Sequence, residues 1–149
     1  MPTTHAAQIL WVAIIAAGLF GLLKGGPAER IGAGATLLIS IAFVIVNELV
    51  AETGRPVPHL VLDGLLALVF LALAVRYASL WIGAVMLLQG VQFSLHAYFF
   101  VTKLTPGVTY AIVNNLVTWG TLLGIVLGTL AYRRHASAAS AGKPITPAI

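Results

Sequence analysis

The sequence predicts an all-α integral membrane protein, a bundle of five transmembrane helices. Two observations predict this class. The 149 residues are 60% apolar and 8% charged, whereas a soluble domain carries about 25% charged residues. The apolar residues also form runs as long as the roughly 20 residues that a helix needs to cross a bilayer. Such spans must be helical because lipid offers no partner to backbone N–H and C=O groups.

The first two spans are expected at residues 6–23 and 31–50. The segment GGPAERIGAG, residues 25–34, lies between them and overlaps the start of the second span. Its glycines predict a flexible connection on the inner side of the membrane, with Lys24 and Arg30 as the basic residues that mark that side.

The third and fourth spans come from one apolar run, Leu60 to Val101. This run is about twice as long as one span requires, so the chain must turn back inside it. The sequence RYAS, residues 76–79, holds the only basic residue of the run and is the predicted turn. The third span is therefore expected at residues 59–75 and the fourth at residues 80–100.

The fifth span is expected at residues 108–132 and completes a single transmembrane domain, residues 1–135. Residues 136–149 are small, polar and proline-containing, which is typical of a disordered tail. Pro56, Pro58 and Pro106 are expected in the connections, where a missing N–H breaks no helix hydrogen bond.

The basic residues orient the bundle, because cytoplasmic loops of membrane proteins carry the excess of lysine and arginine. With the N-terminus outside, six of the eight basic residues lie on the inner side, and only Arg55 and Lys103 lie outside. The sequence therefore predicts a multi-pass protein of a bacterial-type inner membrane, N-out and C-in. The basic residues form no stripe that could follow phosphates, so no nucleic-acid partner is expected.

Two spans carry small residues at a spacing of four, which lets helix backbones approach closely in lipid. These residues are Ala13, Ala17 and Gly21 in the first span and Gly120, Gly124 and Gly128 in the fifth. One interpretation is packing inside the bundle, with the first span against the fifth. The other is a docking face for another membrane protein or a second copy of this chain.

Polar residues gather in the outer third of four spans. Gln89, Gln92 and His96 share one face of the fourth span, at helical positions i, i+3 and i+7. Other spans place further polar residues at this level, namely Glu48, Asp63, Asn114 and Asn115. Polar groups in lipid are costly, so these should face protein or water. They form either interhelical hydrogen bonds, at about 0.6–2 kcal/mol each, or an outward-facing pocket for a ligand or ion.

No motif for catalysis or for a cofactor is present. The chain has no cysteine, which excludes thiol chemistry and thiolate metal sites. Its histidines lack the HxxxH and HExxH spacings of metal ligands, so neither a metal nor a haem is expected. Ser94 and His96 lie two residues apart, so on a helix they point to different faces and cannot form a nucleophile and its base.

These observations favour a non-enzymatic accessory or assembly subunit of a membrane complex, held by its small-residue faces. The alternative is a small transporter or ligand-binding membrane protein that uses the outer polar pocket. Replacing pocket residues such as Asp63 and His96 should abolish binding or transport in the second case and barely affect assembly in the first.

The predicted orientation can be tested by fusing a reporter after Ile149. A reporter that is active only in the cytoplasm should give signal, because the positive-inside bias places the C-terminus there. A reporter that is active only outside the membrane should stay silent. The reverse pattern would overturn the N-out, C-in orientation.

Overall fold

The computed structural model describes residues 5–105 and 107–140, and within them the chain is helical without a β-strand. This confirms the predicted all-helical class, and five of the helices are long and apolar enough to cross a membrane, as a multi-pass protein requires. A short 3-10 turn, η1, lies at Glu52–Gly54. The five helices are α1 His5–Lys24, α2 Pro27–Leu49, α3 Pro56–Tyr77, α4 Leu80–Thr102 and α5 Val108–Ser140.

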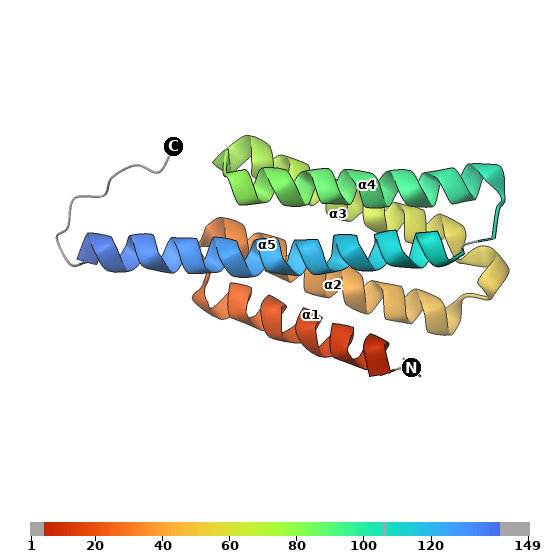
Figure 1. Cartoon of the computed structure of the whole chain (residues 1–149), viewed down its shortest axis with the longest axis horizontal. Helices are drawn as coiled ribbons and strands as arrows, with labels where there is room; N and C mark the ends of the chain where they lie inside the picture. Colours follow the sequence, from red (N-terminus) through yellow and green to blue (C-terminus); the bar gives the residue numbers. More distant parts are fainter. Residues whose placement is uncertain (1–4, 106, 141–149) are drawn as a thin grey trace.

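The helices form a closed ring (Figure 1). Each packs against its neighbours in the sequence, and α5 returns to pack against α1. The start of α1 and the α2–α3 and α4–α5 connections lie at one end, called here the N-terminal end. The α1–α2 and α3–α4 connections and the end of α5 lie at the opposite, C-terminal end. Successive helices run in opposite directions. Because there are five of them, α1 and α5 run in the same direction where the ring closes.

The α1–α2 connection is shorter than predicted. Only Gly25 and Gly26 separate the two helices, and most of the expected flexible segment belongs to α2. Pro27 begins α2, where the missing N–H would have had no intrahelical partner. Glu29 therefore lies in the first turn and is only 7% exposed. A carboxylate at this position is favoured by the helix dipole.

Three other boundaries also differ from the predicted ones. Pro56 and Pro58 lie in the first turn of α3 rather than in a connection, for the reason that applies to Pro27. Helix α5 continues to Ser140, so residues 136–140 are helical rather than part of a disordered tail. Pro106 and residues 141–149 lie outside the described residues. The third helix ends inside the predicted turn, where Ala78 adopts a left-handed conformation with φ 43°.

The glycines of α5 face α4. A Cβ at Gly120 would lie 2.6 Å from Leu88, and one at Gly128 would lie 2.5 Å from Trp81. Gly124 is pressed directly against Val85, also in α4. The absence of side chains thus lets the two helices approach closely, and this face is not available to a partner.

The small residues of α1 do not meet these glycines. Helix α1 packs against α5, as the sequence predicted, but a Cβ at Gly21 would lie 2.7 Å from Ala33 of α2 and 2.9 Å from Ile125 of α5. The ridge of α1 thus packs inside the bundle against α2 and α5, whereas the glycines of α5 pack against α4. Helix α5 lies between α4 and α1 in the ring. The side of α5 that carries its glycines faces α4, and a different side of α5 faces α1.

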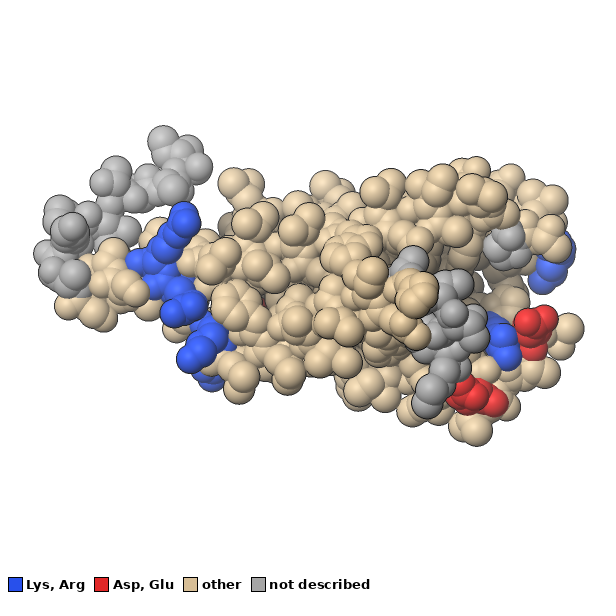
Figure 2. Space-filling view, turned by 60° about the horizontal axis from the view of Figure 1, so that its bottom comes forward, with Lys and Arg blue, Asp and Glu red and all other residues tan. Residues whose placement is uncertain are grey.

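Large apolar side chains fill the ring toward the C-terminal end. Phe70 and Ile125 are fully buried there, and a Cβ at Gly32 would lie 3.1 Å from the ring of Phe70, which covers this glycine. Outside the ring, many large apolar residues stay exposed, as lipid-facing positions must be. The charged residues lie near the two ends, with an uncharged band between them on the face that Figure 2 shows.

The tight α4–α5 contact predicts the effect of two glycine substitutions. Gly124→Leu should lower the free energy of unfolding by about 1–3 kcal/mol or more, because the new side chain overlaps Val85. Gly90→Leu is the control, since nothing lies within 4 Å of a Cβ at Gly90; it should change stability by less than about 0.5 kcal/mol. Unfolding in a denaturing detergent, followed by circular dichroism, measures both. Equal losses would contradict the packing.

Candidate functional site

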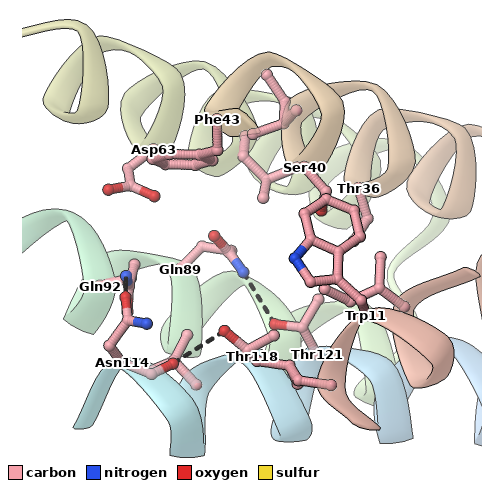
Figure 3. Close-up of a pocket in the computed structure, with 15 residues that line it drawn as sticks. Trp11, Thr36, Ser40, Phe43, Asp63, Gln89, Gln92, Asn114, Thr118 and Thr121 are labelled. Carbon is pink, nitrogen blue, oxygen red and sulfur yellow. Dashed lines mark hydrogen bonds between the residues drawn. The ribbon is translucent and has the colours of Figure 1, made fainter. Parts of the chain in front are cut away.

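A cavity of about 250 Å³ lies inside the ring, in the half toward the N-terminal end (Figure 3). At about 30 Å³ per molecule, this volume has room for roughly eight waters. All five helices contribute to its wall. The lining residues are Leu10, Trp11, Ile14, Thr36, Ile39, Ser40, Phe43, Asp63, Leu66, Gln89, Gln92, Asn114, Val117, Thr118 and Thr121.

Two glutamines of α4 form hydrogen bonds to α5 at the wall of this cavity. Gln89 donates through Nε2 to Thr121 Oγ1 at 2.9 Å, and Gln92 donates through Nε2 to Asn114 Oδ1. Their exposed fractions are only 3% and 6%. Among the described residues, the Oε1 atom of Gln92 is buried without a hydrogen-bond partner. A buried acceptor left unpaired costs about 1–3 kcal/mol.

Asp63 joins the cavity to a chain of polar contacts that crosses three helices. Its Oδ2 atom contacts Nδ1 of His96, and Nε2 of His96 contacts the hydroxyl of Tyr110. A carboxylate only accepts hydrogen bonds, so Nδ1 carries the proton that faces Asp63. The tyrosine hydroxyl can donate to Nε2 of a neutral imidazole or accept from a protonated one.

A second polar group lies beside this network, where α2 meets α3. The ring of His59 lies 6.4 Å from that of His96, and its Nε2 atom lies 3.1 Å from Oδ1 of Asn47. Arg55 donates to the carbonyls of Val50 at 2.8 Å and Asn47 at 2.9 Å. These contacts satisfy carbonyls that the end of α2 leaves without helical partners. They also fix the α2–α3 connection, which leads directly into the start of α3, where His59 lies.

The structure brings together most of the polar residues that the sequence singled out. Four of the seven line the cavity: Asp63, Gln89, Gln92 and Asn114. His96 is joined to it through Asp63. Glu48 and Asn115 are exposed and lie outside the lining. Asn115 differs from Asn114 because consecutive residues on a helix point about 100° apart.

Sequence reasoning missed part of the wall on α1 and α2. One face of α2 carries three polar residues at spacings of four and seven: Thr36, Ser40 and Asn47. This pattern could have indicated that Thr36 and Ser40 face the interior. Trp11 lies near the start of a span, a position typical of an interfacial aromatic, and nothing in its surroundings predicts a cavity wall. Phe43 lies well inside the second span, and nothing in its surroundings predicts a cavity wall either.

The wall is rich in acceptors and carries one carboxylate, from Asp63, without a lysine or arginine. The described residues contain no group of three or more His, Asp or Glu that could hold a metal ion. Comparison of the chain with protein-family models, curated proteins and solved structures finds no match. The geometry of the cavity is therefore the basis for its chemistry: a site with hydrogen-bonding side chains and one negative charge.

The hydrogen bond between Gln89 and Thr121 can be tested with a double-mutant cycle. Gln89→Leu and Thr121→Val together should show a coupling energy of about 0.6–1.7 kcal/mol, the range of interhelical hydrogen bonds in membranes. In the control cycle, Thr118→Val replaces Thr121→Val, because the Thr118 hydroxyl donates to the Asn114 carbonyl of its own helix. That coupling should be near zero. Equal couplings from detergent unfolding would show that the Gln89 contact is absent.

Proposed function

We propose that the protein is a ligand-binding membrane protein, or a small transporter, whose cavity holds a small polar solute. One observation carries this proposal: a cavity lined by all five helices, with the Asp63 carboxylate and the amides of Gln89, Gln92 and Asn114 at its wall. Ligand sites in helix bundles are typically built in this way, from an apolar cavity with a few convergent polar groups.

Structural hydrogen bonding explains only part of the wall. The bonds from Gln89 to Thr121 and from Gln92 to Asn114 hold α4 to α5. Residues that served only this purpose could pack without space beside them, as the side chains around Phe70 do. Here an open volume adjoins the amides, and Asp63 lies on the facing wall from α3 (Figure 3). Binding accounts for both the open volume and the acceptors around it.

The proposed orientation places this cavity toward the outside of a bacterial-type inner membrane. Figure 2 supports it, since on the face shown only lysine and arginine appear at the C-terminal end, whereas both charge signs appear at the other. The packing around Phe70 and Ile125 separates the cavity from the C-terminal end. A solute would enter from outside, and transport would require that packing to open.

A role as an accessory subunit is the second candidate, and one surface feature favours it. A shallow apolar groove runs between α1 and α5, with Ala13, Ala16 and Ala17 on one side and Trp119 on the other. Small residues on one wall suit the close approach of another membrane helix, from a partner protein or a second copy. The Gly124→Leu variant described above changes the packing of α5 against α4 and therefore does not report on this groove.

Both candidates can be tested by native mass spectrometry of the protein released from native membranes in a mild detergent. A ligand-binding protein should carry a small-molecule adduct or gain thermal stability from a panel of cationic, neutral and anionic polar solutes. Ser40→Leu and Asn114→Leu should abolish either signal by filling the cavity.

Asn115→Leu is the matched control, since this exposed neighbour lies outside the lining. Wild-type protein without an adduct or a stabilising solute would contradict ligand binding. A stoichiometric companion protein in the same spectra would instead support the accessory role.

A further inference from the structure

We propose that the solute is a small organic cation, a protonated or quaternary amine, with Asp63 as its counter-charge. This inference rests on the proposed function, because it names the class of ligand that the cavity would bind. Three features of the wall carry it: its charge, the direction of its hydrogen bonds, and its aromatic side chains.

The charge of the wall favours a cation. Asp63 is the one charged side chain in the lining, and it is 3% exposed. An anionic ligand would lie beside this carboxylate without a lysine or arginine in the wall to offset the repulsion. A cation gains from a carboxylate in a low-dielectric site far more than it would in water. His96 contacts Oδ2 of Asp63 from the neighbouring helix and is outside the lining.

Two hydroxyls of the wall can accept hydrogen bonds from a ligand. The hydroxyls of Thr36 and Thr118 both donate at 2.9 Å to carbonyls of their own helices, so they present lone pairs to a ligand. Gln89 and Gln92 each direct an amide N–H at α5. An ammonium N–H, or the polarised C–H groups around a quaternary nitrogen, can use these acceptors.

The size and the aromatic side chains distinguish an organic cation from a metal ion. A bare metal ion is usually held by several charged or imidazole ligands, but the cavity has one carboxylate, and the described residues contain no group of three or more His, Asp or Glu suited to a metal. Trp11 and Phe43 lie on the wall formed by α1 and α2, and apolar side chains such as Ile14 extend it (Figure 3). Aromatic faces attract organic ammonium groups through cation–π contacts, and apolar walls cover their alkyl groups.

The test compares choline with 3,3-dimethyl-1-butanol, a neutral molecule of nearly the same shape in which carbon replaces the charged nitrogen. Butylammonium serves as the protonated-amine probe. The full chain in a mild detergent is titrated with each compound, and the shift in melting temperature gives a Kd. We expect choline or butylammonium to bind at least about tenfold more tightly than the neutral compound, since a desolvated charge pair strengthens binding.

Two variants assign this preference to the wall. Asp63→Asn should remove the preference for the cation and leave the weak binding of the neutral compound unchanged. Glu48→Gln removes an exposed carboxylate outside the lining and should leave the preference intact. If Asp63→Asn does not fold because His96 loses its partner, Trp11→Leu provides the second variant and should weaken binding of the cation more than that of the neutral compound.

The outcomes separate the two proposals. Equal binding of choline and its neutral counterpart, or stabilisation by neutral or anionic solutes alone, overturns the cation inference and leaves the proposed function in place. Absence of binding by both cations also overturns the inference. If no solute of any charge in the wider panel binds, the proposed ligand-binding function itself fails.

Discussion

Lipid supplies no hydrogen-bond partner, and this constraint decides which side of each helix faces the interior of the ring. Gln89 and Gln92 of α4 cannot face lipid without losing their bonds, so they point to α5 and find Thr121 and Asn114. Asp63 is subject to the same constraint and meets His96. The rotation of α3, α4 and α5 about their axes is therefore set by their polar stripes, and the apolar remainder of each helix faces outward.

Close packing and open space occupy different halves of the same ring. Toward the C-terminal end, Gly21 and Gly32 bring backbones close to large side chains, and Phe70 is fully buried. Toward the N-terminal end, polar side chains of moderate size hold the helices together without filling the space between them. The cavity follows from this difference, since hydrogen bonds fix separations between helices that apolar packing would close.

The two halves also hold one buried carboxylate each, in different surroundings. Glu29 lies in the first turn of α2, where the helix dipole favours its charge. Asp63 faces a cavity, contacts His96 and lies within a chain of polar side chains from three helices. Glu29 thus has a structural explanation within its own helix. His96 contacts only Oδ2 of Asp63, so the carboxylate has a second oxygen for a ligand, and for this reason it carries the proposed binding site.

Hydropathy and helical spacing are local properties, so they were enough to predict the helical class, the number of apolar spans and several of the polar residues of the wall. They also predict that Asn114 and Asn115 point in different directions, but not which of the two faces the interior. The packing of the helices was needed to show that α5 presents its glycines to α4, that α2 begins at Pro27 and buries Glu29, and that Trp11 and Phe43 line one cavity with Asp63. These features depend on which helices become neighbours when the ring closes, and no spacing along one chain encodes that choice.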